Sequence, residues 1–290
     1  MSIDLLARLQ ALASEPPEAR LEALSALVGE VDVGELAGSE AGNLLAAQLV
    51  EVIDSGEGSG RDRLVLGELL GHLGDPRLSA PADEDYWVRI PSDLGGEVVV
   101  GRFPVTNAEY KAWVDAGGYD DATAWTDEGK AWLDQTDDPW PVQAARDGSA
   151  PYIVPNQPVV GVTFFEADAY ARAHGARLLN NDERVWVVRG EERRPYPWGS
   201  PFGEGHANTR EEVLERPCAV GLFVGDRTPE GVCDLAGNVA EWNGDVVGAV
   251  RMIHPGAWDQ PSMAAWAKAK ELNPPDARWA GLGFRLARDA

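Results

Sequence analysis

Residues 231–242 read GVCDLAGNVAEW, a short stretch in which small residues and a Gly-Asn pair separate an aspartate from a Glu-Trp finish. With a cysteine directly before the aspartate, three interpretations are open: an active-site loop, a metal-binding loop, or a tight turn. Gly237 can adopt the backbone angles that a tight loop requires. In the purely structural interpretation, Asn238 and Glu241 hold the turn while Trp242 packs into the core.

The composition of the chain changes near residues 80–86. The first of the 11 tryptophans is Trp87; Leu, Ala and Glu are abundant before it, whereas Trp, Gly and Pro dominate after it. A length of 290 residues suits one large and one small domain, since domains usually hold about 100–200 residues. We therefore predict a small helical domain over residues 1–80 and a larger domain over residues 81–290.

Apolar residues recur at helical spacing in the N-terminal part, which predicts three helices within residues 1–54 and a fourth over residues 64–74. Two prolines separate the first two helices, and Gly74 suits the end of the fourth. The fourth segment, LGELLGHLGDPRL, resembles the second helix of a HEAT-like repeat, which is a packing pattern. The apolar stripes of the first three helices are Leu5, Leu6 and Leu9; Leu21, Leu24, Leu27 and Val28; and Leu44, Leu45, Leu49 and Val52.

After residue 86 the chain consists of short runs broken by turn residues, which predicts a mixture of short strands and helices. Residues 117–150 show weak periodicity and are expected to form a long loop, which in a compact domain is usually functional. The expected strands are YWVRIP (86–91) and EVVVGRFPV (97–105), and the expected helices cover residues 107–117, 164–176 and 180–189.

The formal net charge is -23, and only four of the 290 residues are lysine. Such a surface repels phosphate backbones and anionic lipid, so nucleic acid and membranes are not expected partners. A partner with a basic surface would complement an acidic face, and a merely solvated acidic surface is the alternative. No apolar run approaches the length of a membrane span, and the N-terminus lacks a basic leader, so we expect a cytoplasmic protein.

Six separated motifs occur in one order along the larger domain: RFPVTNAEYKAWVDAGGY (102–119), QPVVGVTFFEADAYARAHGARL (157–178), YPWG (196–199), HANT (206–209), GVCDLAGNVAEW (231–242) and GFRLA (283–287). Together they resemble the formylglycine-generating enzyme, or sulfatase-modifying factor, domain family. The resemblance covers residues 86–290 and implies an irregular α+β fold related to C-type lectins, preceded here by the small all-α domain. The family includes copper-dependent oxidases, iron-dependent enzymes that form carbon–sulfur bonds, and binding or display modules.

The resemblance also implies what catalysis would need. Family oxidases bind copper through two cysteines in the C-terminal tract, but residues 250–287 contain no cysteine. Cys218 and Cys233 lie in other motifs and are expected to be small buried thiols. The iron-dependent branch needs a histidine-rich helical site, whereas the N-terminal helices hold one histidine. We therefore expect no copper, no iron and no catalytic residues, and hence a protein that is not an enzyme.

Transfer of the family's calcium motif, position by position, implies a structural calcium ion in the GVCDLAGNVAEW loop. Asp234 and Glu241 would supply side-chain oxygens, while Gly237 and Val239 would supply backbone carbonyls. Asn208, in HANT, matches a second calcium position of the family. Calcium prefers carboxylate and carbonyl oxygens of this kind.

These observations predict a binding or regulatory module that contacts another protein in a bacterial defence or signalling system. The binding surface is expected around residues 117–150 and 252–280, where aromatic side chains would anchor a partner. The candidate anchors are Trp125, Trp132, Trp258 and Trp266. Two alternatives stay open: a copper-dependent oxidase that acts on a sulfatase cysteine, and a ligand-display protein of a diversity-generating system.

Overall fold

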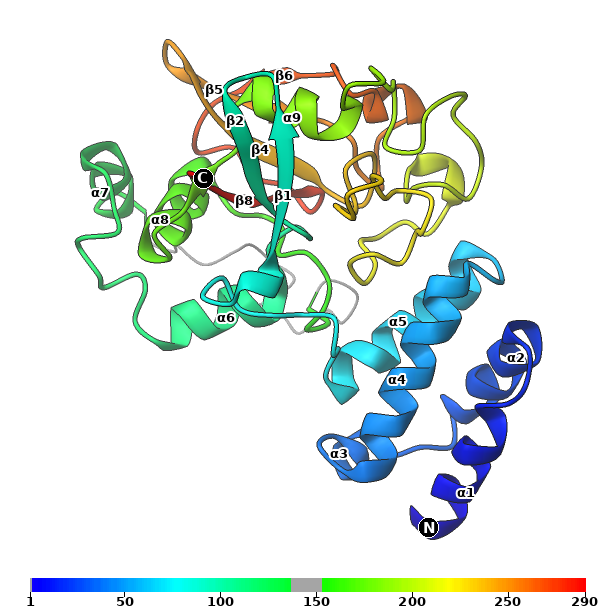
Figure 1. The fold of residues 1–290 in the computed structure, drawn as a ribbon. Helices are drawn as coiled ribbons and strands as arrows, with labels where there is room; N and C mark the ends of the chain where they lie inside the picture. The colour runs from blue at the N-terminus through cyan, green and yellow to red at the C-terminus, as the bar shows by residue number, and fades with distance from the viewer. Residues whose placement is uncertain (1, 137–152) are drawn as a thin grey trace.

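The structure is a computed structural model that describes residues 2–136 and 153–290. Its first five helices lie together on one side of the molecule, and the later helices surround two small sheets (Figure 1). The helices of this first part are α1 (Ser2–Leu12), α2 (Pro17–Leu27), α3 (Val33–Leu36), α4 (Glu40–Ser55) and α5 (Gly60–Leu73). The four helices predicted from apolar spacing are therefore present, and the short α3 is an addition.

Hydroxyl groups determine where the two longest of these helices begin. Ser39 accepts a hydrogen bond from the N–H of Gly42 at the start of α4, and Ser59 accepts one from Asp62 at the start of α5. Gly74 follows the last residue of α5, as the sequence predicted. The apolar faces of the helices then meet in a shared core, which includes Leu9, Leu24, Leu27, Leu45, Leu49, Ile53, Leu66 and Leu70.

Residues from the C-terminal half of the chain complete this helical core. The contributing side chains are Leu214, Cys218, Ala219, Leu222 and Phe223, from the segment that crosses directly above α5 in Figure 1. Glycines on α5 allow the close approach: a Cβ added at Gly67 would lie 2.9 Å from the Cβ of Ala219. At Gly71 it would lie 2.2 Å from Oδ1 of Asn156. Helix α5 therefore packs against the rest of the chain through a face formed by glycines, which have no side chain.

Two four-stranded sheets form the centre of the larger part, in the orders β1-β2-β8-β3 and β6-β5-β4-β7. All neighbouring strands run antiparallel except β4 and β7, which are parallel and place Trp242 beside Phe284. The strands of the first sheet are β1 (Trp87–Ser92), β2 (Gly96–Gly101), β8 (Leu286–Arg288) and β3 (Arg177–Leu178). Those of the second are β6 (Glu271–Asn273), β5 (Val250–His254), β4 (Ala240–Val247) and β7 (Leu282–Phe284).

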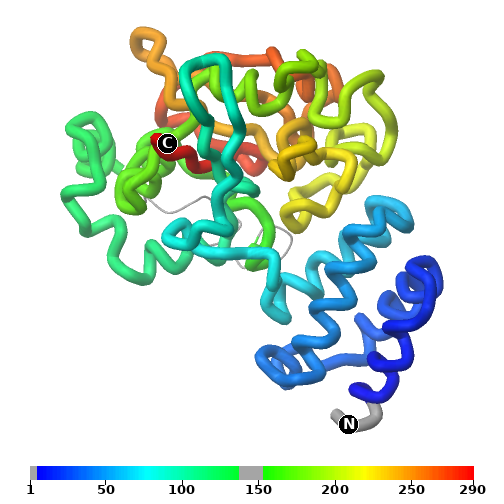
Figure 2. Tube along the Cα trace, viewed as in Figure 1, coloured from blue at the N-terminus to red at the C-terminus, as the bar shows by residue number. Residues whose placement is uncertain are grey.

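Four helices pack around the sheets: α6 (Asn107–Asp115), α7 (Asp127–Leu133), α8 (Phe164–Ala173) and α9 (Asn181–Arg189). In α6, α8 and α9 a polar residue and a glutamate three positions later exchange hydrogen bonds at the first turn, which fixes where each helix begins. The C-terminal residues lie beside α8, whereas the N-terminus lies at the far end of the helical part (Figure 2). Short 3-10 turns occur at Glu84–Tyr86, Arg210–Glu212 and Ser262–Ala265.

Aromatic side chains fill the space between the sheets and α6–α8. Trp242 is fully buried, and its Nε1–H donates to the carbonyl of Val162 at 2.9 Å. Tyr110 and Tyr170 stack with ring centroids 5.6 Å apart, and Phe284 meets both rings edge-on. Such ring pairs add packing energy beyond their buried area, so they hold the irregular domain together.

The predicted fold class is confirmed: the chain forms an irregular α+β domain preceded by a small all-α part. The expectation of a long loop over residues 117–150 is wrong at α7, where Thr126 caps the first turn. Residues 137–152 of that loop lie outside the described residues. Among the described helices, none combines the length and the apolar character needed to cross a membrane.

Candidate functional site

The loop at residues 231–242 is built around a buried carboxylate that the sequence did not single out. Asp226 accepts hydrogen bonds from the N–H groups of Leu235, Ala236 and Gly237 at 2.9–3.0 Å. Asp234 adopts a left-handed backbone conformation, with φ of 55°, and its carboxylate accepts the N–H of Gly221 at 2.7 Å. The loop therefore wraps around Asp226, and its shape is determined within the protein.

Asp226 and Asp234 are both buried, and burial changes their pKa values. Burial raises the pKa of Asp226 to about 6, against the opposing effect of its backbone hydrogen bonds. Burial and the neighbouring Asp226 together raise the pKa of Asp234 to about 7. A carboxyl group that titrates near neutral pH makes the stability of the loop sensitive to pH.

Glu241 is held between two arginines rather than being free to bind a ligand. Its carboxylate lies 2.8 Å from Nη2 of Arg285 and 3.5 Å from Nε of Arg184, and all three side chains are buried. Arg285 also donates to the backbone carbonyls of Cys233 and Asp234, at 2.6 and 3.1 Å. The guanidinium of Arg285 thus ties the loop to the end of the chain, a role that no sequence pattern assigned to it.

The five predicted calcium ligands are neighbours, and several of their groups are already engaged, although Oδ1 of Asn208 is buried without a hydrogen-bond partner among the described residues. The backbone of Asn208 lies against Gly237, and its carbonyl accepts the N–H of Asn238. The carbonyl of Gly237 accepts the N–H of Val239, and Asp234 and Glu241 are bonded as described. The arginines balance the charge of Glu241, so this carboxylate offers little negative charge to a calcium ion. Calcium therefore stays a prediction from the sequence, and no step below depends on it.

The two cysteines lie in separate hydrogen-bonded environments. Cys218 contacts Asn208 and Asn238, whereas Sγ of Cys233 lies 3.6 Å from the carbonyl of Gly231. Burial raises the pKa of Cys233 to about 11 and that of Cys218 well above its usual value. Both groups are therefore neutral thiols near neutral pH, which agrees with the expectation of small buried thiols. Within the described parts of the chain, no group of three or more His, Cys, Asp or Glu side chains is arranged to hold a metal ion.

The four predicted tryptophan anchors differ in exposure. Trp125 is buried in the aromatic core, where Trp132 stacks on it, so Trp125 offers no surface to a partner. Trp258 is half-buried, and its Nε1–H donates to the carbonyl of Ala280. Trp266 is 47% exposed and is accessible to a partner. Part of the predicted surface, residues 137–152, lies outside the described residues.

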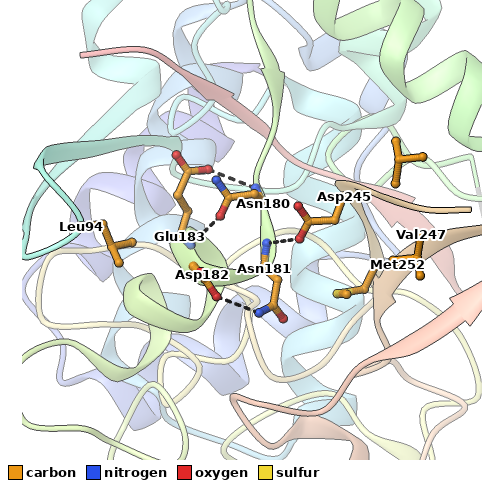
Figure 3. A pocket seen from close by; sticks show the side chains of 9 residues that line it. Leu94, Asn180, Asn181, Asp182, Glu183, Asp245, Val247 and Met252 are labelled. Carbon is orange, nitrogen blue, oxygen red and sulfur yellow. Dashed lines mark hydrogen bonds between the residues drawn. The ribbon is translucent and has the colours of Figure 1, made fainter.

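The structure also contains a groove that the sequence did not predict. It encloses about 630 Å³ between the start of α9, the end of β4 and the turn that joins β1 to β2 (Figure 3). Its lining is Leu94, Asn180, Asn181, Asp182, Glu183, Asp245, Val246, Val247 and Met252. Three of these apolar side chains are exposed, namely Leu94 (52%), Val246 (61%) and Val247 (44%). The volume lies within the range of about 300–1,000 Å³ that is typical of ligand pockets.

Hydrogen bonds fix the polar side of the groove. The carboxylate of Asp245 accepts the N–H of Asn181 at 2.8 Å, which joins the end of β4 to the first turn of α9 (Figure 3). Asn180 and Glu183 exchange hydrogen bonds across that turn, and both oxygens of Glu183 also bind Arg177 at 2.7 Å. The groove is therefore preformed on strands and a helix, which suits specific recognition.

Comparison with known proteins assigns the family. A sequence model described as the sulfatase-modifying factor enzyme 1-like domain matches residues 97–290. The chain belongs to this family. Hercynine oxygenase of Mycolicibacterium thermoresistibile is 36% identical over 154 residues, 49% of this chain and 34% of that protein. The formylglycine-generating enzyme of Streptomyces coelicolor is 30% identical over 171 residues, 47% of this chain and 54% of that protein.

A further sequence relative and a solved structure are also similar to this chain. The inactive C-alpha-formylglycine-generating enzyme 2 of Bos taurus is 29% identical over 153 residues, 46% of this chain and 50% of that protein. Among solved structures, PvdO from Pseudomonas aeruginosa has 22% identity and a TM-score of 0.49, covering 71% of this chain and 91% of that one. The chain spans between 34% and 54% of the length of the three curated relatives named here.

These relatives overturn the prediction that the chain is not an enzyme. Three proteins that are 36%, 34% and 32% identical to it are each named hercynine oxygenase, so the family to which it belongs includes enzymes. The prediction rested on the lack of a histidine-rich helical site and on a missing pair of cysteines, and that pair concerns copper-dependent oxidation alone. Its absence from the C-terminal tract therefore carries no weight against the other reactions of the family.

Proposed function

We propose that the chain is a recognition domain of the sulfatase-modifying-factor family that binds a segment of another protein in the groove beside α9. The observation that carries the proposal is the preformed groove with three exposed apolar side chains, Leu94 on one side of the first turn of α9 and Val246 and Val247 of β4 on the other (Figure 3). Apolar side chains that gather at a concave surface and remain open to water mark binding sites more often than isolated exposed residues do.

The proposal concerns recognition, a step that enzymes and binding modules of this family both require. The oxygenases and the formylglycine-generating enzyme among the relatives each act on a substrate that must first be bound. A groove built on α9 and β4 can perform this step whether or not a reaction follows. It also gives residues outside the six family motifs a part in function.

In this proposal the helical segment 1–80 and the domain 81–290 act as one body. Support comes from the helical core, which contains Phe223 and Leu222 of the domain, and from ion pairs that join the two parts. Arg216 contacts Glu68 at 2.5 Å, and Arg227 contacts Asp54 at 2.9 Å. We place the protein in the cytoplasm, where free buried thiols such as its two cysteines are common.

Site-specific photo-crosslinking tests the proposal. A photoreactive amino acid at position 247, in the groove, is expected to yield a distinct adduct in cells of the source organism. The same amino acid at Val65, an exposed position on α5, is the matched control and should yield no such adduct. Adding Val246→Ser should abolish the adduct at position 247, because the apolar wall is lost. Equal adducts at both positions, or none in the groove, would refute the proposal.

A further inference from the structure

We infer that the groove binds an extended, positively charged segment in which an apolar side chain lies next to Lys or Arg. The inference rests on the proposed function, because it names the chemistry of the segment that the groove would recognise. Two features of the groove carry it: carboxylates that lack a cationic partner, and an apolar wall directly beside them.

The carboxylates of the groove differ in whether a cation already neutralises them. Glu183 is paired on both oxygens with Arg177. Asp182 and Asp245 form no salt bridge with any residue that the structure describes, and their carboxylates accept hydrogen bonds from amide groups of Asn181, at 3.0 and 2.8 Å. Neutral donors leave the charge of a carboxylate in place, so two negative charges face the groove uncompensated.

A helix begins at the groove, yet the site does not suit an anion. The free N–H groups of a first helical turn would attract phosphate or carboxylate. In α9, however, Asp245 already occupies the N–H of Asn181, and Oδ1 of Asn180 accepts the N–H of Glu183 at 2.9 Å. Both of these N–H groups already donate to oxygens of the protein, and the electrostatic potential that remains in the groove is negative.

The rest of the groove wall is apolar and flanks the carboxylates on both sides, which disfavours a simple inorganic cation as the ligand (Figure 3). Leu94 extends from the turn between β1 and β2, Val246 and Val247 lie at the end of β4, and Met252 of β5 is buried below them. A bare ion would leave this wall exposed to water. A Lys or Arg side chain can pack its hydrocarbon stem on the wall while its charge reaches a carboxylate.

The net charge of the whole chain also favours a positively charged ligand. With a net charge of -23, the protein attracts cationic segments over the distance of the Debye length, about 8–10 Å at physiological ionic strength. Association should therefore be fast at low salt and should weaken as salt is added. Binding that is held by apolar contacts alone would not weaken in this way.

Fluorescence anisotropy with three labelled five-residue probes tests the inference. The probes are blocked at both ends and alternate Lys with Val, Glu with Val, or Lys with Ser. The full chain is expected to bind the Lys–Val probe, and the other two probes should bind at least about tenfold more weakly. Equal binding of the Glu–Val probe would overturn the requirement for charge, and equal binding of the Lys–Ser probe would overturn the requirement for an apolar side chain.

Paired variants of the protein supply the matched control. Asp182→Asn combined with Asp245→Asn removes both charges while keeping the acceptor for the N–H of Asn181. Since exposed ion pairs contribute about 0.2–1 kcal/mol each, loss of two should make the double variant bind the Lys–Val probe roughly two- to thirtyfold more weakly. Asp120→Asn, on the exposed connection between α6 and α7, should bind normally. Unchanged binding by a double variant whose melting temperature is preserved would overturn the inference.

The two proposals can fail separately. If crosslinking at position 247 succeeds but the charged probes and the double variant show no preference, the groove binds a protein segment of another chemistry. If the probes bind as expected but no adduct forms in cells, the groove has the inferred specificity without a protein partner. Failure of both experiments would remove the groove as a recognition site.

Discussion

Replacing Glu241 with alanine is expected to lower the free energy of unfolding by about 3–5 kcal/mol, the usual effect of removing one partner from a buried ion pair. The side chains of Arg285, Glu241 and Arg184 are 1%, 4% and 5% exposed, so water cannot replace the lost carboxylate. Arg285 would keep its bonds to four backbone carbonyls, whereas Arg184 would keep the carbonyl of Leu235. The two buried guanidinium groups would then lose their ion-pair partner and keep longer-range electrostatic interactions with Asp226 and Asp234.

Urea unfolding followed by tryptophan fluorescence measures this loss. Domains are usually stable by about 5–15 kcal/mol, so the variant should unfold at a clearly lower urea concentration with an unchanged slope. Glu97→Ala is the control, because Glu97 forms an ion pair with Arg89 in which the two side chains are 43% and 48% exposed. Its loss should stay below about 1 kcal/mol.

The same titration separates the ion pair from the calcium site predicted by the sequence. If Glu241 held calcium, adding the ion would stabilise the native protein and a chelator would abolish most of the difference between native protein and variant. If the arginines hold Glu241, the difference is the same with calcium and with chelator. A loss below about 1 kcal/mol in the presence of chelator would refute the reasoning from the ion pair.

Three further outcomes follow from buried contacts. Gly71→Ala should destabilise the chain by about 1–3 kcal/mol in thermal unfolding, because the new Cβ would lie 2.2 Å from Oδ1 of Asn156. This loss should outweigh the better helix propensity of alanine. Gly29→Ala is the control and should be nearly neutral, because a Cβ there would have nothing within 4 Å. The raised pKa of Asp234 gives stability that is fully present below its unfolded value of 3.8 and is lost as pH rises through about 7, so Asp234→Asn should flatten the fall in unfolding free energy over that range. Because burial raises the pKa of Cys233 to about 11, and Cys218 is also buried, both thiols should react with a thiol reagent only after unfolding. Rapid labelling of the native protein would contradict this.

Local patterns were sufficient to predict most elements of the fold. Apolar spacing located α1, α2, α4 and α5, and short runs between turn residues located α6, α8 and α9. These signals succeed because the interactions lie within a few residues of one another. The helix α7 was missed because its seven residues follow Asp- and Gly-rich sequence, and Thr126 was not recognised as its cap.

The groove could not be predicted because its walls come from distant parts of the chain. Leu94, Asn181 and Val247 are brought together only by the packing of both sheets against α9. In addition, the pairing of β4 with β5 shifts register between Trp242 and Val246. A shift of this kind turns side chains relative to the strand, and here Asp245 meets the N–H of Asn181. No spacing rule in the sequence encodes that displacement.

The calcium prediction stays untested, and its limit as an inference from sequence is electrostatic. A motif transfers the identity of oxygen ligands, but the charge available to a metal depends on every neighbouring cation. Arg285 and Arg184 lie 44 residues after and 57 residues before Glu241 in the chain, and both reach it in the fold. Two arginines on one carboxylate leave little negative charge for calcium, and only the three-dimensional structure shows this.

Strand β4 connects the family motif to the proposed binding site. At one end, Glu241 and Trp242 are buried among arginines and aromatic rings; at the other, Val246 and Val247 face the groove. The two ends of the strand also differ in charge compensation. Glu241 is neutralised by arginines, whereas the carboxylate of Asp245 accepts its hydrogen bond from a neutral amide. Changes in the exposed half can therefore alter what is bound without disturbing the core that holds the strand.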